Sequence, residues 1–399
     1  MTAAFSGLFA LPHKEPGCKY ELSLISHRFE RRRLAFTRRL SDAQHQAIEE
    51  AVQLMERGDW PFEEVPCPCG GRSFRVLAIQ DRFSLPSPLS ACCFCGLLQA
   101  NPRMTESAYR EFYEHYYRRI YMGWEPEVLF ENQLSRGRSV KRWLARNANL
   151  SFGAGDKVIE IGAGAGGILA AFAEDGCLVT GCDYDDRFLA FGRDRGIELV
   201  QGDAGCLNKS GQARLIILCH VFEHMTSPVK ELQRIREMLV PEGFLWIQVP
   251  GVSFELMHYH RGGHKLFDFL DYAQNAHTYH FDRRDLLRLV TTAGFECASS
   301  DDQVTALFRQ IRHHRELELD PPSCSSADAD ASLAQLRRLR EMEFRRTFTR
   351  WIENPIRAFI PLTRHAFRSA LGKSGMLRLS GPHLRRHKPK LSSPGSSSR

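Results

Sequence analysis

One glycine-rich loop stands between a run of apolar residues and a helical pattern. It reads Glu160-Ile161-Gly162-Ala163-Gly164-Ala165-Gly166-Gly167. Glycines are needed where the chain turns tightly and its backbone must approach a ligand without a Cβ in the way. Gly162, Gly164 and Gly167 also satisfy the Gly-x-Gly-x-x-Gly pattern of dinucleotide sites, so the glycines alone do not identify the ligand.

Carboxylates around this loop favour a cationic ligand over a pyrophosphate. Glu160 precedes Gly162 by two residues, where its charge would repel a pyrophosphate. Asp183 ends the next predicted strand and could hold ribose hydroxyls, and Asp203 with Ala204 follows the third strand. Each acid alone could be a helix N-cap or a solvated loop residue. Their joint spacing around one sheet edge predicts a site for a positively charged nucleoside.

These features resemble the Glu-x-Gly-x-Gly-x-Gly loop of class I S-adenosylmethionine (SAM)-dependent methyltransferases. The resemblance covers about residues 156–310 and extends to the segment Cys219–Pro228, which is similar to the His-Val-Leu-Glu-His segment of that family. It implies that SAM is the cofactor and that His220 lies near the sulfonium, with a catalytic role. The cofactor-binding residues that it implies are Glu160, Gly162, Gly164, Gly166, Asp183, Asp203, Ala204 and His220.

The same segment raises the question of a metal. In the related ubiquinone-pathway O-methyltransferases, a Glu, Glu, His set binds a divalent cation at this place, and His220 replaces the first of those residues here. The alternative is that Glu223 and His224 merely cap and pack the following helix. The sequence leaves open whether His220, Glu223 and His224 bind a second metal.

Two cysteine clusters stand about 25 residues apart, Cys67-Pro68-Cys69-Gly70 and Cys92-Cys93-Phe94-Cys95-Gly96. Four thiolates suit tetrahedral zinc, and a glycine after each pair lets backbone amides turn toward the sulfurs. We predict a structural zinc held by Cys67, Cys69, Cys92 and Cys95, with Cys93 as a rival ligand and unrelated buried thiols as the alternative. Such a zinc contributes on the order of 10 kcal/mol to the folding of a small module.

The cysteine module and its sequel Gly96–Thr105 resemble the N-terminal zinc-ribbon region of bacterial methyltransferases that include sugar C-methyltransferases. Those enzymes carry a His-rich segment before the helix that leads into the sixth strand, here Asp271–Phe281. The resemblance implies catalytic roles for His277 and Tyr279, because an imidazole suits proton removal near neutral pH. Asn275-Ala276 replaces the His-Glu pair of that family, so methylation of a sugar carbon is one option among several.

The insertion from Gly251 to Phe281 contains a set of histidines, and a lone histidine is more often structural than catalytic. Three of the set could instead bind a metal. The set consists of His258, His260, His264, His277 and His280.

Regular alternation of apolar strands and helices between residues 156 and 310 predicts an α/β fold with a Rossmann-like, seven-stranded, mostly parallel sheet. The predicted strands are Lys157–Ile161, Leu178–Asp183, Ile197–Gln201, Arg214–Cys219, Phe244–Val249, Glu296–Ser300 and Val304–Arg309. The predicted helices are Gly167–Glu174, Asp185–Arg195, Pro228–Leu239 and Asp282–Ala293, the last with Asp282 as N-cap.

Changes of composition divide the whole chain into seven segments. We expect a helical N-terminal segment (1–60), a zinc-ribbon-like β module (61–103), a helical collar (104–150) and a methyltransferase domain (151–312) with a lid insertion (251–281). A linker (313–330), C-terminal helices (331–372) and a basic disordered tail (373–399) follow.

Composition excludes several classes of protein. The 399 residues are 43% hydrophobic and 25% charged, which is typical of globular chains and excludes wholesale disorder. The net charge of +7 is concentrated in the C-terminal region, because residues 354–399 hold ten Lys and Arg and no acid. A mildly acidic remainder argues against a nucleic-acid partner.

No run of 18 apolar residues suggests a transmembrane segment. Phe5–Pro12 is short and lacks a basic lead, which argues against a secretory signal. We therefore expect a cytoplasmic protein whose 12 cysteines are thiols or metal ligands.

The sequence thus predicts a SAM-dependent methyltransferase that acts on a small molecule or on a sugar or polysaccharide precursor. The rival hypothesis is a zinc-ribbon interaction protein with a vestigial methyltransferase domain, which docks on an acidic partner or membrane surface through its basic tail. The accepting atom, whether carbon, nitrogen or oxygen, and the oligomeric state stay open.

Overall fold

The computed structural model describes residues 18–26, 29, 40–121, 125–207, 212–254, 269–311, 330, 333–334 and 336–345. The chain divides into the units Met1–Arg346 and Thr347–Arg399, and all described residues belong to the first. Several predictions therefore lie outside the described residues. They concern His258, His260 and His264 of the lid, nearly all of the linker 313–330, most of the C-terminal helices and the tail 373–399.

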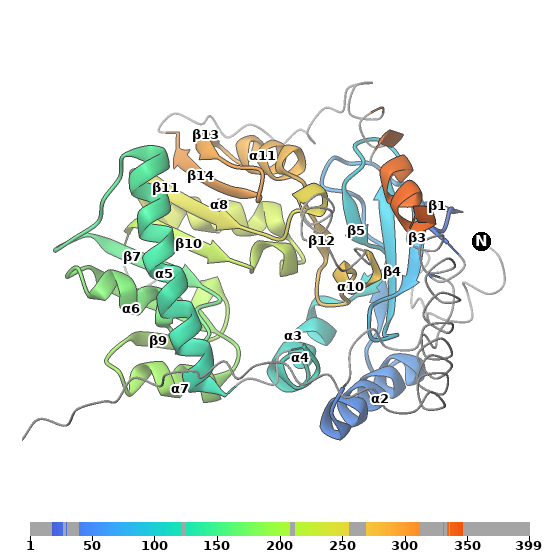
Figure 1. The fold of residues 1–399 in the computed structure, drawn as a ribbon, viewed down its shortest axis with the longest axis horizontal. Coiled ribbons are helices and arrows are strands. Elements are labelled where there is room, and N and C mark those ends of the chain that lie inside the picture. Colours follow the sequence, from blue (N-terminus) through green and yellow to red (C-terminus); the bar gives the residue numbers. More distant parts are fainter. Residues whose placement is uncertain are drawn as a thin grey trace, which may run out of the picture. The chain divides into compact units, whose positions relative to one another are not determined.

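A seven-stranded sheet organises residues 157–310 (Figure 1). Its order is β13-β14-β11-β10-β7-β8-β9, and β7 to β11 are parallel while β14 runs antiparallel to both β11 and β13. The predicted α/β class and mostly parallel sheet are confirmed. The strands are β7 (Lys157–Ile161), β8 (Leu178–Asp183), β9 (Glu198–Gln201), β10 (Ala213–Cys219), β11 (Leu239–Gln248), β13 (Phe295–Ser300) and β14 (Thr305–Gln310).

Both faces of this sheet are buried, which explains why its strands are continuous apolar runs. Val158 and Ile217 belong to one core cluster, with Leu144, Phe172 and Trp246, while their neighbours Ile159 and Ile216 belong to another, with Leu232 and Leu286. Alternate side chains of one strand therefore face opposite layers. The helices over the first face are α5 (Pro126–Ala148) and α6 (Gly167–Ala173); those over the second are α8 (Pro228–Met238) and α11 (Arg283–Thr292).

Helix α11 begins after Asp282, as predicted, but the Asp282 side chain makes no capping hydrogen bond. It accepts hydrogen bonds from the backbone N–H and the hydroxyl of Ser253 instead, at 2.7 and 2.9 Å. Asp282 therefore ties the helix to the segment that follows β11.

A second sheet of five strands carries the cysteines, in the order β1-β3-β4-β5-β12. Its members are β1 (Lys19–Leu22), β3 (Ser73–Gln80), β4 (Pro86–Cys92), β5 (Leu98–Ala100) and β12 (Tyr279–His280), and a separate ribbon pairs β2 (Phe62–Glu63) with β6 (Arg103–Met104). Two strands come from outside the predicted module 61–103. The predicted helical N-terminal segment 1–60 also contains a strand, because Lys19–Leu22 pairs with β3 from Ser73 onward.

Helices are also described in the N-terminal half of the chain. Helix α2 (Asp42–Arg57) begins with a capping box between Ser41 and Gln44 and ends at Gly58 in the left-handed conformation. The aromatic-rich collar forms α3 (Glu106–His115), α4 (Tyr117–Tyr121) and the start of α5. Its rings pack against α2 around the buried Trp60, and α3 and α4 lie between the two sheets in Figure 1.

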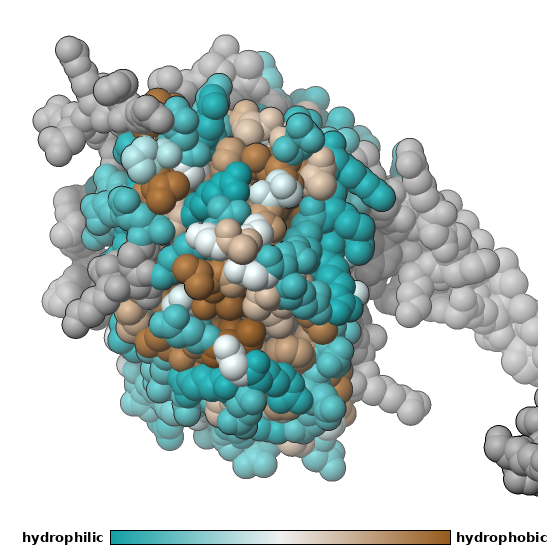
Figure 2. Space-filling model, turned by 90° about the vertical axis from the view of Figure 1, so that its left-hand side faces the viewer, coloured by the Kyte–Doolittle hydropathy of each residue, from teal (hydrophilic) through white to brown (hydrophobic). Residues whose placement is uncertain are grey.

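The side of the molecule at the left of Figure 1 faces the viewer in Figure 2. There, apolar residues gather in the middle of a hydrophilic surround. Within the described part of the chain, no helix is both long and apolar enough to cross a bilayer.

Candidate functional site

A cavity of about 990 Å³ opens at the carboxyl ends of β7, β8 and β10. Strand order reverses at β7, which lies between β8 and β10, and ligands of open α/β sheets bind at such a switch point. The cavity walls come from the glycine loop, from α3, α4 and α5, and from the segment after β10. Of the residues predicted from the sequence, Gly162, Gly164, Asp183, Asp203, Ala204 and His220 line it.

Four other predicted residues do not line the cavity. Glu160 belongs to β7, before the loop, and is only 1% exposed. Gly166 is the last loop residue before α6. His277 and Tyr279 are buried beside the strand β12 and reach the cavity only through their neighbours.

The glycine loop has the conformation that only glycine adopts without strain. Gly162, Gly164 and Gly166 have φ values of 73°, 55° and 79°. A Cβ on Gly162 would lie 2.3 Å from Val221 Cγ2, in the segment after β10. Glycine is therefore required at Gly162 by the close approach of Val221, and Gly162 and Gly164 also line the cavity.

Gln133 of α5 holds this loop in place, and sequence reasoning missed it. Its side-chain oxygen accepts from the backbone N–H groups of Ala165 and Gly167, and its nitrogen donates to the Ala163 carbonyl at 2.9 Å. An uncharged polar residue between Leu129 and Gly137 on the buried side of α5 was the available clue. The predicted collar thus supplies part of the cofactor loop.

Glu160 carries a buried carboxyl group beneath the loop. Among the described residues, its Oε2 atom has no hydrogen-bond partner. Burial, followed by the nearby charge of Asp183, raises the pKa of Glu160 well above its usual value, and Arg136 opposes this shift. A cation bound at the loop would compensate the buried charge that the protein leaves without a partner.

Asp183 connects the loop to helix α4. Its Oδ2 atom accepts from the backbone N–H of Gly164 at 2.9 Å, and its Oδ1 atom accepts from Asp185 N–H. The Arg118 guanidinium lies 3.1 Å from Asp183 and 2.9 Å from Asp185. Arg118 is a second site residue that sequence reasoning missed, since only the fold brings α4 to the end of β8.

Asp203 is more open. Its side chain is 40% exposed and accepts from the backbone N–H of Gly205 at 2.8 Å, which leaves the Oδ2 atom toward the cavity and 4.0 Å from Arg110. Ala204 is buried beneath it. This acid begins the short helix η2 (Ala204–Leu207) and is available to a ligand.

His220 lies at the end of β10 with φ of 55°. A non-glycine residue in this region is strained, and such strain occurs most often at functional sites. Its backbone N–H donates to the Gln248 carbonyl, and its 40% exposed ring lines the cavity 3.7 Å from Glu223. The backbone conformation thus presents an imidazole to the cavity.

Behind His220 lies a cluster of buried histidines. His224 lines the cavity, and its ring centroid is 4.9 Å from that of His277, which is 5.4 Å from that of His280. Burial lowers the pKa of all three rings, in the case of His280 to about 3. The three imidazoles are therefore neutral at physiological pH.

Tyr279 is buried in β12 and does not line the cavity. Its hydroxyl accepts from Arg103 at 3.5 Å, and the same guanidinium nitrogen donates to the Thr226 carbonyl at 2.7 Å. Thr226 lines the cavity, so Tyr279 contacts the site through Arg103.

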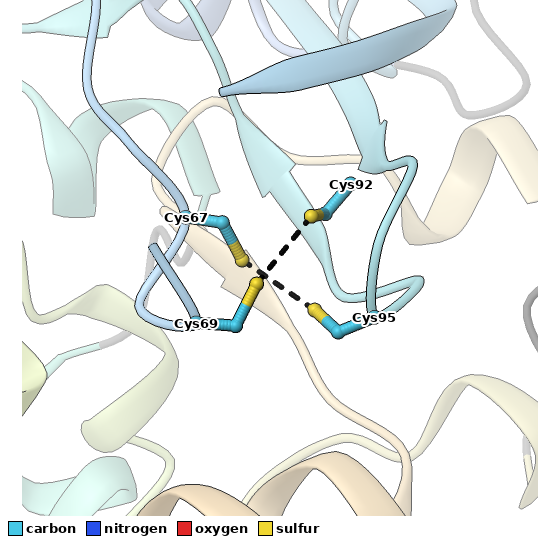
Figure 3. A group of neighbouring side chains, drawn as sticks. All are labelled: Cys67, Cys69, Cys92 and Cys95. Carbon is cyan, nitrogen blue, oxygen red and sulfur yellow. Dashed lines mark hydrogen bonds between the residues drawn. The ribbon is translucent and has the colours of Figure 1, made fainter. Parts of the chain in front are cut away.

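The four predicted zinc ligands converge in the five-stranded sheet (Figure 3). The Sγ atoms of Cys67 and Cys95 are 3.5 Å apart, and those of Cys69 and Cys92 are 3.6 Å apart. A tetrahedral zinc with Zn–S bonds of about 2.3 Å needs sulfur atoms about 3.8 Å apart. Cys93, the rival ligand, is not in this group, which holds the four predicted cysteines.

Glycines shape the turns around these sulfurs. Gly70 and Gly96 have φ values of 82° and 81°, and a Cβ on Gly71 would lie 2.9 Å from Cys92 Sγ. Hydrogen bonds from the other thiols, first that of Cys67, lower the pKa of Cys95. The donor set and its spacing fit a zinc ion.

Comparison with known families identifies the larger sheet. The family model of a methyltransferase domain matches residues 131–300, which include the glycine loop and the strands from β7 to β13. The chain carries a methyltransferase domain. The match begins within α5, so the helix that holds the loop belongs to the same domain. No curated protein matches the chain.

Among solved structures, several methyltransferases show limited similarity to this chain. Magnesium protoporphyrin IX methyltransferase from Synechocystis PCC 6803 is 16% identical, over 52% of this chain and 100% of its own, with a TM-score of 0.37. The 1,6-didemethyltoxoflavin N1-methyltransferase from Burkholderia thailandensis is also 16% identical, over 56% and 96%, with a TM-score of 0.38. A SAM-dependent methyltransferase from Archaeoglobus fulgidus is 20% identical, over 43% and 74%, with a TM-score of 0.33.

Proposed function

We propose that this methyltransferase transfers the methyl group of SAM to a small molecule or to a sugar or polysaccharide precursor, and that a structural zinc stabilises its cysteine-bearing sheet. The observation that carries the proposal is the buried Glu160 carboxylate, whose Oε2 atom lacks a partner among the described residues, beneath a loop whose Gly162 and Gly164 line the cavity. A cationic sulfonium nucleoside suits this charge, whereas a diphosphate does not.

In this proposal, each residue predicted to bind the methyl donor has a role that follows from its position. Gly162, Gly164 and Gly166 let the backbone approach the donor, Glu160 favours its cationic end, and Asp183 holds ribose hydroxyls. Asp203 and Ala204 border the base. Bound SAM supplies a methyl group activated by the sulfonium, so the tasks left to the protein are alignment, exclusion of water and removal of a proton.

His220 is the residue that we propose to remove the proton. Its ring lines the cavity, and a neutral imidazole suits general-base work near neutral pH. Tyr279 would act as a positioning residue, because its contact with Arg103 reaches the cavity wall at Thr226. His277 would act through His224, its neighbour at the wall.

The walls opposite the loop support a polar acceptor with a flat or ring-shaped body. Tyr113 and Tyr184 stack at 6.2 Å with an interplanar angle of 11°, and Tyr109 and Tyr117 line the same cavity. Arg110 and Arg136 also line it and could bind phosphates of a nucleotide-linked sugar.

Calorimetry and turnover test the proposal. We expect S-adenosylhomocysteine to bind and NADH not to bind, and we expect a pooled extract of small metabolites and nucleotide sugars to gain label from methyl-labelled SAM. The His220→Gln variant should retain donor binding and lose about 100-fold or more in turnover. Binding of NADH without S-adenosylhomocysteine would overturn the donor assignment. Donor binding with no labelled product from any extract would favour the docking protein with a vestigial domain.

A further inference from the structure

A second group of potential ligands lies directly behind the cavity. We propose that Glu223, His224 and His277 bind a divalent first-row transition-metal ion, at a site separate from the four cysteines. One oxygen of Glu223 and one nitrogen of each histidine lie within 4.8 Å of one another. The site is composite, because Glu223 and His224 follow β10 in η3 (Phe222–His224), whereas His277 comes from the segment before β12.

The Glu223 carboxylate is the first independent observation for a cation. Its side chain is 2% exposed, and neither oxygen has a hydrogen-bond partner among the described residues. Burial of an ionised carboxylate without a partner costs several kcal/mol. The Oε1 atom of Glu223 lies 3.7 Å from His220 Nδ1 and 3.9 Å from His224 Nε2, beyond hydrogen-bond distance from both.

The orientation of His224 is the second observation. Its Nδ1 atom lies 2.9 Å from the Ala276 carbonyl, which accepts hydrogen bonds only. Nδ1 therefore carries the proton, and in the neutral ring Nε2 is the bare nitrogen that faces Glu223. Metal-binding histidines are held in this way, with the second ring nitrogen donating to a backbone carbonyl.

The same short segment also supplies His277. Ala276 orients His224 through its carbonyl, and the next residue places a second neutral imidazole against the first. Tyr113 fixes the segment from the other side, since its hydroxyl donates to Ala276 at 2.8 Å. Asn275-Ala276 stands where the sugar C-methyltransferases have a His-Glu pair. The orientation of His224 needs only the backbone carbonyl of Ala276, which this replacement keeps.

Two imidazoles and one carboxylate are the ligands of open, three-residue metal sites. Metal–ligand bonds of about 2.1 Å place such atoms about 3.4 Å apart, so the side chains must close by roughly 1 Å on binding. Glu223 and His277 are buried, whereas His224 borders the cavity, so the remaining coordination position faces the acceptor. This last step rests on the proposed function. The ion would bind an oxygen of the methyl acceptor and lower the pKa of that acceptor group.

Cobalt(II) is the probe for this site, because thiolate and imidazole ligands give it different spectra. The full chain, with its cysteine cluster filled by zinc, should take up one Co²⁺ whose spectrum lacks sulfur-to-cobalt charge-transfer bands. Glu223→Gln and His277→Gln should each weaken this binding by ~100-fold or more. The matched control His115→Gln removes an exposed imidazole from α3 and should leave binding unchanged.

Thermal melting and S-adenosylhomocysteine binding show whether each variant is folded and whether the donor site is intact. No Co²⁺ uptake, uptake only with sulfur bands, or unchanged uptake in folded Glu223→Gln would overturn the metal site. Should a variant not fold, the wild-type spectrum still decides. The metal assay needs neither donor nor acceptor, so its failure is separate from failure of the proposed function, which would appear as absent donor binding.

Discussion

Glycine turns of the same kind occur at the four cysteines and at the cavity edge of the seven-stranded sheet, which we call the donor edge, but their roles differ. Both regions place glycines at positive φ, Gly70 and Gly96 after the cysteines and Gly162 and Gly164 after β7. Around the cysteines, the turns bring four sulfurs to within the spacing of one metal ion. At the donor edge, the turns border a cavity and lie above the Glu160 carboxyl group, whose Oε2 atom has no partner in the described part of the chain.

The difference shows that the surroundings of a glycine turn decide its role. The cysteine cluster is buried in the core together with Phe74 and Leu97, so its ligand would serve folding. The donor edge is half open, with His220 and Asp203 each 40% exposed, so its ligand can enter and leave. Substitutions in the first region should change stability, and those in the second should change binding.

The largest expected effect is that of Cys95→Ser. Loss of one thiolate removes a metal site worth on the order of 10 kcal/mol, so we expect loss of zinc and a fall in melting temperature of roughly 10 °C or more. Metal analysis and calorimetry measure both. The matched control is Cys93→Ser, two residues earlier and outside the group of four, which should keep its zinc. Equal zinc content and equal melting temperature in the two variants would mean that Cys95 contributes no more to metal binding than Cys93.

A smaller effect is expected from Gly162→Ala, compared with Gly155→Ala. Both glycines have positive φ, at 73° and 88°, but a Cβ at Gly155 has nothing within 4 Å whereas one at Gly162 meets Val221. Gly155→Ala should cost about 1 kcal/mol of unfolding free energy through the backbone alone. Gly162→Ala should cost about 3 kcal/mol and weaken S-adenosylhomocysteine binding at least ~10-fold. Equal losses in both variants would mean that Val221 moves aside freely.

The smallest expected effect is a pH dependence of donor binding through Glu160. Its pKa is raised in the free protein by burial and by Asp183 on β8, with Arg136 of α5 opposing, and a cationic donor should lower it again. Binding therefore releases a proton, and affinity should rise with pH until Glu160 is ionised in the free protein.

Calorimetry in two buffers of different ionisation enthalpy measures that proton. Glu160→Gln should abolish the release and flatten the pH profile, with no loss of zinc. Methylthioadenosine, which lacks the charged amino-acid end, provides the matched ligand and should release no proton. Release that persists in Glu160→Gln would assign the linkage to another group.

The sequence predicted the seven-stranded sheet well because its information is local. Each strand is a short apolar run next to a helix of regular period, and the observed bounds of β7 and β8 equal the predicted ones. The five-stranded sheet was predicted only in part. Lys19–Leu22 and Tyr279–His280 are short strands whose pairing with β3 and β5 spans more than 50 residues of sequence, and no local pattern encodes it.

The candidate site follows the same division. Gly162, Asp183, Asp203 and His220 end or follow strands, and parallel strands bring such residues to one edge, so their convergence on one cavity was predictable. Gln133 and Arg118 were not predicted because helix placement, not spacing, brings them to the loop. His277 falls behind the cavity because the pairing of β12 with β5 fixes its direction.

Strand β12 also sets a limit on how the protein can be divided. It leaves the methyltransferase domain between β11 and α11, pairs with β5 of the cysteine-bearing sheet, and returns. A shortened chain that starts at residue 151 would keep every strand of the seven-stranded sheet. It would lack β5, however, so β12 would lose its hydrogen-bonding partner. Neither half is therefore self-sufficient, and on the proposed zinc site a shortage of zinc in the cell would reduce methyl transfer as well as the stability of the cysteine-bearing sheet.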